Sequence, residues 1–519
     1  MKKGIIFSEG LMLLSNLLSS SAVEYRFAES RAVSSIEIND IFLDSRQVVK
    51  NGLFIAIEGV HTDSHAFLHD AERNGAVAAI ISQGAVYDRR IEPEKFGIPL
   101  ICVDDCRDAM ARVYSAWYSH PERSMDFIGV TGTNGKTTVS RMIFETLSRS
   151  GCRCGLIGTV GNLISGCEDE LDIKPESSLA NMTTPDPREL YKILSQMRER
   201  GVRYVIMEVT SHALALSKVA PIDFQVGVFT NLTEDHLDFH SGMEDYYQAK
   251  KKLFARCRKA VINIDDRYGR RLSNEIECEK VTCSSEGRAA DFNACDIRCH
   301  GEDGMEYRLA SGRMRLRIKT KIPGAITVMN TLETAAVCNL LGVPPREIKE
   351  SLADIDGIRG RLERLKFKEK VDFSVYIDYA HTPDALENLL RTAKMFAKKG
   401  QRIILVFGCG GAREKPKRAM MGRIAALMAD FTVITSDNPR SEDPSDIIGD
   451  IISGIGDAGQ FAVIEKREEA IEYVIKNARS GDIILLAGKG HEEYYIDRDG
   501  RHDFSERETV ARYVSRYYG

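Results

Sequence analysis

Short apolar runs alternate with longer amphipathic stretches along almost the whole chain. This pattern is typical of layered α/β domains, because parallel strands are buried on both faces while each connecting helix buries one stripe. Most runs end in Gly, Asp, Asn or Thr, and α/β sheets bind ligands at the carboxyl ends of their strands. We therefore predict an α/β fold with mainly parallel strands at residues 52–57, 126–132, 203–209, 225–231, 259–265, 374–380, 402–408, 431–437 and 482–488.

Two sections depart from this pattern. Residues 284–321 predict irregular or antiparallel strands. Residues 1–20 carry Lys2 and Lys3 before an apolar run that Glu9 interrupts, which favours an amphipathic first helix over a signal peptide. No apolar run reaches the roughly 18 residues of a membrane-spanning helix, so we expect no stable association with a membrane.

A chain of 519 residues predicts about three domains. A polar stretch at 119–126 separates a helical pattern from a new strand, and Gly and Arg residues cluster at 356–365. We place domains at 1–124, 125–359 and 360–519.

The composition is that of a soluble globular protein, with 43% hydrophobic residues, 28% charged residues and a net charge of −5. No overall basic field favours nucleic acid, so anionic ligands must be bound by local clusters. The twelve cysteines show no zinc-like spacing, which indicates a reduced, cytoplasmic protein.

The stretch "DFIGVTGTNGKTTVSRMIFETL" reads as a strand, a glycine-rich loop and a helix. Gly132 and Gly135 allow backbone N–H groups to approach phosphate oxygens, Lys136 adds a positive charge, and Thr137 offers a hydroxyl to Mg²⁺. Val130 stands where the usual phosphate loop has its first glycine. The context nevertheless favours nucleotide binding.

Acidic and imidazole groups follow the next predicted strands. Glu208 ends an apolar run, where a carboxylate is costly unless it has a function. Asp235, His236, Asp238 and His240 follow the strand at 225–231 and indicate metal or phosphate contact rather than a turn alone.

The stretch "TSDNPRSED" follows the apolar run at 431–435. Asp, Asn and Pro are turn formers, so a simple turn is one interpretation. The other is a pocket in which Arg440 pairs with a ligand carboxylate.

Four motifs, "GVTGTNGKTT", "MEVTSHAL", "TNLTEDHLDFH" and "YAHTPDAL", occur in an order that resembles the Mur ligases, ATP-dependent amide-forming enzymes of peptidoglycan synthesis. The resemblance covers nearly the whole chain and is greatest to the members that add meso-2,6-diaminopimelate to UDP-MurNAc-L-Ala-D-Glu. It implies a UDP-binding domain, a central ATPase and a Rossmann-like amino-acid-binding domain. A cytoplasmic monomer with no nucleic-acid partner is expected.

The resemblance also implies binding residues. The UDP-sugar-dipeptide would contact the stretch His61 to Asp63 and the residues Leu43, Ser45, Thr183, Thr184, Thr210, Ser211, His212 and Lys218. Thr210 and Lys218 stand where the family usually has Ser and Arg, Leu216 replaces a polar residue of some members, and Thr327 stands where an asparagine is common. ATP would contact Thr131, Gly132, Thr133, Asn134, Gly135, Lys136, Thr137, Asn330, Arg361, Asp378 and His381, near Tyr379.

The incoming amino acid would contact Arg413, Asp437, Asn438, Pro439, Arg440, Gly488 and Glu492, although Ala412 replaces a usual acid. Within that set, Arg440 suits a carboxylate, whereas Asp437 and Asn438 suit an ammonium. By resemblance alone, Lys250 would be carbamylated. The expected catalytic residues are Lys136, Glu208, His236 and Lys250, and the expected Mg²⁺ ligands are Thr137, Glu208, His236 and the Lys250 carbamate.

The implied reaction has two steps. The D-glutamyl γ-carboxylate attacks the γ-phosphate of ATP, which gives ADP and an acyl phosphate, and the amine then displaces phosphate. Three alternatives stay open: an L-lysine-adding member, a folylpolyglutamate-type ligase, and a P-loop binding protein without catalysis. The arginine of "DNPR" favours diaminopimelate, while Lys136, Glu208, His236, Asp378 and His381 argue for catalysis.

Overall fold

The computed structural model describes residues 11–28, 33–59, 62–167, 182–456 and 459–519. Their contacts form two compact units. Unit 1 comprises residues 1–126, 171–203 and 211–223, and unit 2 comprises residues 127–170, 204–210 and 224–519.

Unit 1 contains a five-stranded sheet that is parallel except for one edge strand. Phe54 and Ile81 are buried on it, and Leu68 and Ala71 of α2 (Leu68–Asn74) pack beside them. In spatial order the strands are β2 (Arg26–Phe27), β7 (Leu100–Val103), β6 (Ala76–Ser82), β5 (Gly52–Ile55) and β4 (Asp40–Phe42).

Helices distant in sequence complete unit 1. The helix α4 (Cys106–Trp117) packs against both α1 (Leu14–Ser21) and α6 (Pro187–Glu199). Arg188 of α6 donates to Asp40 Oδ2 at 2.9 Å and to the Ile41 carbonyl at 3.1 Å. These contacts explain why residues 171–203 belong to unit 1.

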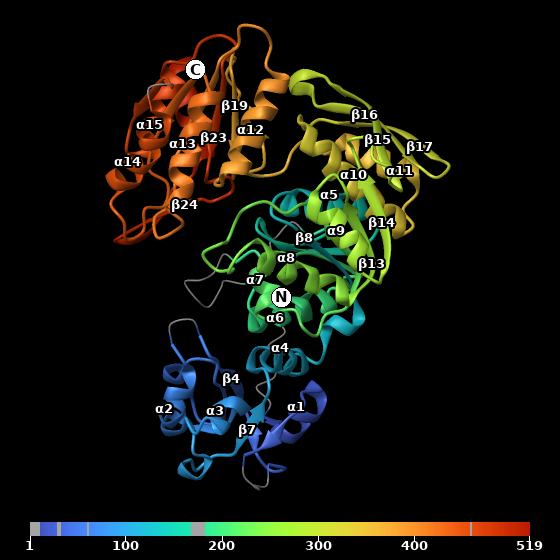
Figure 1. Ribbon diagram of the computed structural model, residues 1–519, viewed down its shortest axis with the longest axis vertical. Helices are drawn as coiled ribbons and strands as arrows, with labels where there is room; N and C mark the ends of the chain where they lie inside the picture. The colour runs from blue at the N-terminus through green and yellow to red at the C-terminus, as the bar shows by residue number, and fades with distance from the viewer. Residues whose placement is uncertain (1–10, 29–32, 60–61, 168–181, 457–458) are drawn as a thin grey trace, which may run out of the picture. The chain divides into compact units, whose positions relative to one another are not determined.

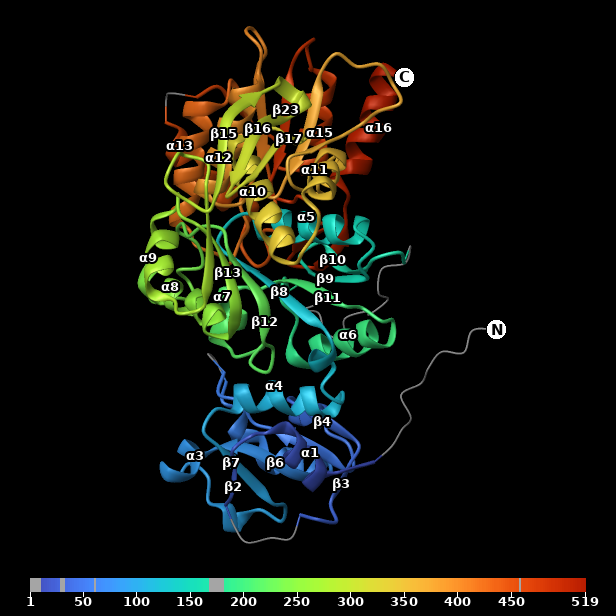
Figure 2. The ribbon, with the colours of Figure 1, turned by 90° about the vertical axis from the view of Figure 1, so that its right-hand side faces the viewer.

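A ten-stranded sheet forms the first half of unit 2, and Figure 2 shows its strands fanned side by side. Its centre is parallel and its two ends are antiparallel. In spatial order the strands are β10 (Gly161–Ile164), β9 (Cys154–Gly158), β11 (Tyr204–Glu208), β8 (Asp126–Thr131), β12 (Phe224–Phe229), β13 (Cys257–Asn263), β14 (Glu279–Ser284), β15 (Phe292–Cys299), β16 (Met305–Ser311) and β17 (Met314–Thr320).

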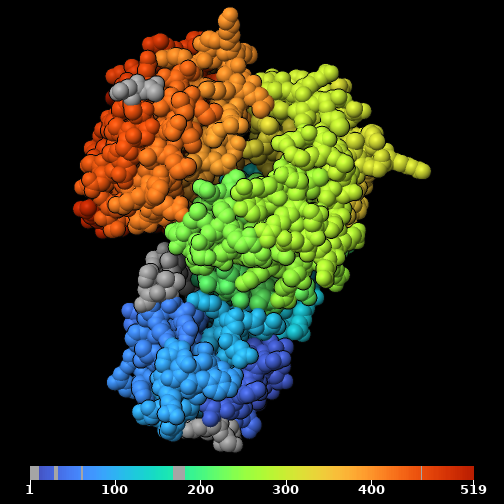
Figure 3. All heavy atoms as spheres, in the orientation of Figure 1, coloured from blue at the N-terminus to red at the C-terminus, as the bar shows by residue number. Residues whose placement is uncertain are grey.

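Three helices bury the core of this sheet: α5 (Lys136–Arg149), α10 (Ala325–Leu340) and α11 (Pro345–Asp354). The outer strands β15, β16 and β17 form an antiparallel hairpin layer, which appears yellow-green to yellow at the surface in Figure 3. In β17, exposed Arg and Lys alternate with inward Leu, Ile and Thr, as expected for a half-buried strand. Irregular or antiparallel strands were predicted for residues 284–321. The antiparallel alternative is confirmed for the pairs β15–β16 and β16–β17, whereas β15 pairs in parallel with β14.

A six-stranded sheet forms the second half of unit 2. It is parallel except for β18, and successive apolar side chains of the inner strands enter different cores. For example, Leu405 faces one core, whereas Ile404 and Val406 face the other. In spatial order the strands are β18 (Glu363–Arg364), β19 (Ser374–Asp378), β23 (Ile483–Ala487), β20 (Ile403–Phe407), β21 (Phe431–Ile434) and β22 (Phe461–Val463).

Helices cover both faces of this sheet (Figure 1). One core is closed by α12 (Pro383–Phe396), α13 (Pro416–Met428) and α14 (Pro444–Ile455). The other is closed by α15 (Arg467–Lys476) and α16 (Glu506–Tyr518).

All nine predicted strands are present, and the predicted α/β class is confirmed. The predicted first helix, within residues 1–20, lies partly outside the described residues. The first helix that the structure describes is α1. No helix of the described residues is long and apolar enough to cross a bilayer. The domain limits at 124 and 359 stay predictions, since the units are drawn by contacts and unit 2 contains both large sheets.

Candidate functional site

The phosphate loop lies between β8 and α5, as predicted. Gly132 has φ +151°, and a Cβ there would lie 1.9 Å from Thr230 Oγ1. Gly135, with φ +89°, immediately precedes α5. No other residue type fits at Gly132, so the backbone N–H groups at the start of α5 remain accessible to an anion.

Two lysines converge on one carbonyl of this loop. Lys136 Nζ donates to the carbonyls of Gly132 at 3.0 Å and Thr133 at 2.8 Å, and Lys250 Nζ donates to Gly132 at 2.7 Å. Burial lowers the pKa of both amines, and the neighbouring Lys136 lowers the pKa of Lys250 further. A pair of cations at one carbonyl favours an anionic ligand at this point.

Lys250 is buried, whereas its neighbours Lys251 and Lys252 are not. The sequence alone did not distinguish these three lysines. The Lys250 side chain is buried on α8 (Met243–Lys251), with Nζ 4.6 Å from the centre of the Tyr246 ring. Lys251 instead forms a 2.8 Å ion pair with Glu275, and Lys252 is exposed.

Glu208 lies beneath the loop at the end of β11. Its Oε2 accepts hydrogen bonds from the hydroxyls of Thr137 and Thr159, each at 2.9 Å. Its Oε1 accepts from the Thr159 backbone N–H at 2.8 Å. Arg361 Nη2 donates to the Thr137 hydroxyl at 3.0 Å, so the predicted arginine reaches the predicted magnesium-binding threonine.

The segment after β12 supplies the predicted histidines. His236 has φ +56°, and its Nε2 lies 3.5 Å from Asp235 Oδ2. Although burial opposes ionisation, His236 and His381 hold the pKa of Asp235 below its usual value. His240 is buried with Nδ1 3.3 Å from Asp245 Oδ2, which gives it a structural partner.

The remaining predicted ATP residues lie around the loop. Asp378 accepts backbone hydrogen bonds from Leu362 at 2.6 Å and Ala380 at 2.8 Å, so it braces the Arg361 turn. Asn134 Nδ2 donates to Asp384 Oδ2 at 2.6 Å. Thr131 is buried at the end of β8, and Asn330 lies in the first turns of α10 beside Gly135.

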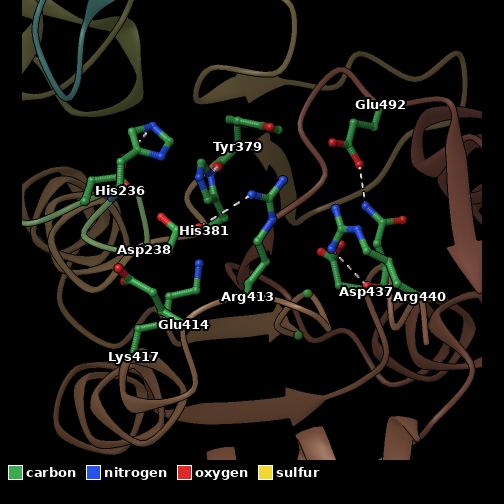
Figure 4. A pocket seen from close by; sticks show the side chains of 15 residues that line it. His236, Asp238, Tyr379, His381, Arg413, Glu414, Lys417, Asp437, Arg440 and Glu492 are labelled. Atoms are coloured by element: carbon green, nitrogen blue, oxygen red, sulfur yellow. Dashed lines mark hydrogen bonds and ion pairs between the residues drawn. The ribbon is translucent and has the colours of Figure 1, made fainter. Parts of the chain in front are cut away.

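A pocket brings the histidine segment and the "DNPR" turn together (Figure 4). Figure 4 shows Asp238, Glu414 and Lys417 on one side and Asp437, Arg440 and Glu492 on the other. The pocket is lined by Asp235, His236, Asp238, Tyr379, His381, Gly408, Gly410, Arg413, Glu414, Lys417, Asp437, Asn438, Arg440, Gly488 and Glu492.

The turn holds Arg440 in the left-handed conformation, with φ +54°. Its Nη1 donates to the carbonyls of Gly411 at 2.9 Å and Asn438 at 3.3 Å. Burial and the nearby Arg413 lower the pKa of Arg440. Two backbone carbonyls therefore aim the guanidinium, which lines the pocket and whose Nε and Nη2 have no acceptor among the described residues.

Acidic groups lie close to Arg440. Burial raises the pKa of Glu492, and Asp437 beside it adds to this effect. Gly488 has φ +115°, and a Cβ there would lie 2.5 Å from Asp437 Oδ2, so glycine is required for Asp437 to sit where it does. Arg413 Nη1 lies 3.9 Å from Asp238 Oδ2, and Pro439 keeps its place in the turn.

Asn438 is oriented differently from the expectation. Its Oδ1 accepts from Lys489 Nζ and from the Ile496 N–H, each at 3.0 Å, while its Nδ2 donates to Glu492 Oε2 at 2.9 Å. Its oxygen is thus engaged inside the protein. Because the group left for a ligand is a donor, Asn438 suits a carboxylate rather than the predicted ammonium.

The residues expected to bind the UDP-sugar-dipeptide belong to unit 1, except Thr210, which belongs to unit 2. Lys218 is buried and forms a 2.7 Å ion pair with Asp186. Ser45 is buried, whereas Leu43 is exposed, and His61 lies outside the described residues. Unit 1 also contains the remaining residues of this set, Thr183, Thr184, Ser211 and His212.

Several site residues were missed from the sequence. Glu414 and Lys417 line the pocket, and Thr159 binds Glu208. Lys489 and Arg467 are buried behind Asp437. Lys489 lies within the "GKGHE" stretch, but a lone lysine after a strand gives no signal that it is buried.

Family models match three consecutive parts of the chain: the Mur ligase family catalytic domain at residues 37–118, the Mur ligase middle domain at 130–338, and the Mur ligase glutamate ligase domain at 360–490.

Curated relatives extend over nearly the whole chain. The UDP-N-acetylmuramoyl-L-alanyl-D-glutamate--2,6-diaminopimelate ligase of Clostridioides difficile is 41% identical over 486 residues, which are 93% of this chain and 96% of that protein. The corresponding ligase 1 of Clostridium acetobutylicum is 40% identical over 485 residues, with the same coverage.

Solved structures share the fold. A UDP-N-acetylmuramoyl-L-alanyl-D-glutamate--2,6-diaminopimelate ligase matches with a TM-score of 0.65 and 28% identity, over 95% of this chain and 97% of that one. MurF from Acinetobacter baumannii matches with a TM-score of 0.60 over 92% of this chain and 96% of that one. Because the two sequences are only 18% identical, this match supports the fold alone.

Proposed function

The chain belongs to the Mur ligase family, and from this premise we propose that it joins meso-2,6-diaminopimelate to UDP-N-acetylmuramoyl-L-alanyl-D-glutamate in an ATP-dependent reaction of peptidoglycan precursor synthesis. One observation carries the substrate assignment. A single pocket runs from His236 and His381, near the phosphate loop, to Arg440, whose guanidinium is aimed by backbone carbonyls.

Diaminopimelate carries a second ammonium and a second carboxylate at its far end. L-lysine has an ammonium there but no carboxylate. Arg440 and the free N–H of Asn438 pair with that carboxylate, and Asp437 and Glu492 pair with the ammonium. Arg413, between the two ends of the pocket, adds a further positive charge. L-lysine would leave the Arg440 guanidinium without its anion.

A magnesium ion fits the residues around the phosphate loop, because Thr137 Oγ1 and Glu208 Oε2 are hard oxygen donors only 2.9 Å apart. These two would bind it, together with His236 and a Lys250 carbamate as expected ligands of a second ion. Bound there, magnesium neutralises phosphate charge.

In the first step, the D-glutamyl γ-carboxylate attacks the γ-phosphorus of ATP, and the β–γ bridging oxygen leaves with ADP. Lys136 and the N–H groups at the start of α5 hold the phosphate oxygens, and Arg361 adds positive charge where charge develops. In the second step, the amine attacks the acyl carbon, loses a proton and expels inorganic phosphate. Catalysis is then mainly positioning and charge compensation.

We also propose the Lys250 carbamate, which forms when the neutral amine adds to carbon dioxide and releases a proton to solvent. Its support is the burial of Lys250 against the phosphate loop, unlike Lys251 and Lys252. Intact and peptide mass spectrometry measure it, and an unmodified Lys250 in fully active protein would refute it.

The reaction requires ATP and a nucleotide-linked precursor, so we place the protein in the cytoplasm, acting as a monomer. The domains would be residues 1–124 for the UDP end, 125–359 for ATP and 360–519 for the amino acid. Limited proteolysis tests the domain limits, and cleavage only inside the predicted domains would contradict them. Light scattering tests the monomeric state, and a stable oligomer would contradict it.

The test is phosphate release from ATP with UDP-MurNAc-L-Ala-D-Glu and a panel of amines. We expect release with meso-diaminopimelate and little with L-lysine. Arg440→Ala should raise the KM for diaminopimelate by at least about tenfold, because a charge-assisted pair is lost, and leave the KM for ATP unchanged. Release with L-lysine but not diaminopimelate would overturn the assignment.

A further inference from the structure

Lys489 is fully buried directly behind the amino-acid end of the pocket. Its Nζ donates to Asn438 Oδ1 at 3.0 Å and to the carbonyl of Tyr494, in β24 (Tyr494–Asp497), at 2.8 Å. It also lies 3.9 Å from Asp437 Oδ1 and 3.8 Å from Glu492 Oε2. A buried ammonium is costly unless it is paired, and three of its partners, Asp437, Asn438 and Glu492, line the pocket.

These contacts decide which way the Asn438 amide faces. An ammonium has donors only, and so has the backbone N–H of Ile496, which also approaches Asn438 Oδ1 at 3.0 Å. The amide atom between them must therefore be the oxygen. The nitrogen consequently faces Glu492, to which it donates one N–H at 2.9 Å. Its other N–H has no acceptor among the described residues, and the Asn438 side chain lines the pocket.

This orientation sets the polarity of the pocket. The Asn438 side chain offers an N–H on the same turn that aims the Arg440 guanidinium, so two donors favour an anion. With the amide reversed, its oxygen would repel a carboxylate. Arg467, also buried, lies 3.9 Å from Asp437 Oδ2 and compensates that acid from its other side.

We propose that Lys489 is a positioning residue for substrate choice: by fixing the Asn438 amide and balancing Asp437 and Glu492, it makes the pocket select an amino acid with a carboxylate at its far end. This inference rests on the proposed function. Lys489 does not touch the substrate and acts through Asn438.

The first test compares Lys489→Met, which keeps an unbranched chain without charge or donors, with Lys399→Met, an exposed lysine of the loop after α12. Steady-state kinetics are measured with meso-diaminopimelate and with L-lysine. Lys489→Met should raise the KM for diaminopimelate at least about tenfold and lower the ratio of kcat/KM for diaminopimelate to that for L-lysine. Its KM for ATP and its kcat at saturation should stay within about twofold of wild type, since a local change leaves the ATP-binding part of the site intact. The control variant Lys399→Met should match wild type in every parameter.

The second variant, Asn438→Asp, applies if Lys489→Met does not fold. It keeps a partner for Lys489, but it replaces the N–H offered to the ligand with a carboxylate oxygen that faces Glu492. We expect the same loss of preference for diaminopimelate. A preference that is unchanged in Asn438→Asp, or in folded Lys489→Met, overturns the inference while the proposed function stands.

A wild-type protein that fails to use diaminopimelate overturns the proposed function and this inference with it. A folded Lys489→Met that loses kcat with every amine equally indicates a general structural role and also overturns the inference.

Discussion

Glu333 is a carboxylate within the core beneath the ten-stranded sheet. It lies on α10 with no exposed surface, and neither carboxylate oxygen has a hydrogen-bond partner among the described residues. Burial raises its pKa well above its usual value, and Cys283 of β14 is one of its neighbours. The side chain is therefore held as a neutral acid, and ionising it in place is costly.

Glu333→Leu should stabilise the protein at neutral pH by about 1 kcal/mol or more, because it removes an unpartnered buried polar group of similar size. The folded-state pKa is raised, so the folded state holds a proton that the unfolded state releases above the ordinary carboxyl pKa of 4.5. Wild-type stability should fall as pH rises above that value, whereas the variant should lack this slope. Thermal unfolding across pH measures both effects.

The exposed Glu347 of α11 provides a control, since Glu347→Leu should change stability by under about 0.5 kcal/mol. A Glu333→Leu variant that is less stable than wild type at every pH would show that the carboxyl has a partner the geometry does not reveal.

Residue types were predictable from the sequence, but their environments were not. Lys136 and Glu208 were identified by their places after strands, and they lie at the phosphate loop. By contrast, burial picks out Lys250 from a run of three lysines, and the orientation of Asn438 depends on Lys489, fifty-one positions later in the chain. Such facts arise from tertiary packing, which local sequence patterns do not encode.

At the scale of elements, one arginine ties two helices to the loop that carries Arg413. Arg418 of α13 is fully buried and donates to Glu442 at 2.9 and 3.0 Å, and to Asp450 of α14 at 2.9 Å. Its Nη2 also lies 3.3 Å from the Gly410 carbonyl, while Glu442 accepts from the Ala412 N–H at 2.5 Å. The loop geometry therefore depends on Arg418 and Glu442 rather than on the side chain of Ala412.

Arg418→Met should destabilise the protein by about 2 kcal/mol and raise the KM for the amino acid, because the carboxylates lose their partner and the loop is released. The Arg418 guanidinium lowers the pKa of Glu442 to about 2. The stability from this depressed pKa is present above the ordinary carboxyl pKa of 4.5 and is lost as pH falls towards 2. The difference between wild type and variant should therefore shrink in acid.

Urea unfolding at several pH values and amine kinetics provide the measurements. Arg423→Met, an exposed arginine on the same helix, should behave as wild type. An Arg418→Met variant as stable as Arg423→Met would refute the role of Arg418 as the tie between these elements.

Elements were the most predictable level of the fold. Apolar runs such as 403–407 and 483–487 give buried parallel strands because every side chain of the run meets a core. The strands β6 and β7 of unit 1 were not among the predictions. The edge strands β10 and β18 have only one neighbour, and their sequences carry too little apolar signal to be recognised.

At the scale of the molecule, each unit contains a different part of the expected chemistry. The phosphate loop, the histidine segment and the "DNPR" turn all belong to unit 2, whereas most residues expected at the UDP-sugar-dipeptide belong to unit 1. Sequence boundaries could not predict that residues 171–203 and 211–223 join unit 1. That membership depends on contacts such as Arg188 with Asp40, made across 148 positions.

The central property of the whole molecule is ligase activity with a preference for diaminopimelate, as proposed above. The most direct measurement is mass spectrometry of the nucleotide product formed from ATP, UDP-MurNAc-L-Ala-D-Glu and equal concentrations of meso-diaminopimelate and L-lysine. We expect a product extended by diaminopimelate, with ADP and phosphate in equal amounts. A product extended mainly by L-lysine, or ATP hydrolysis with no extended nucleotide, would contradict it.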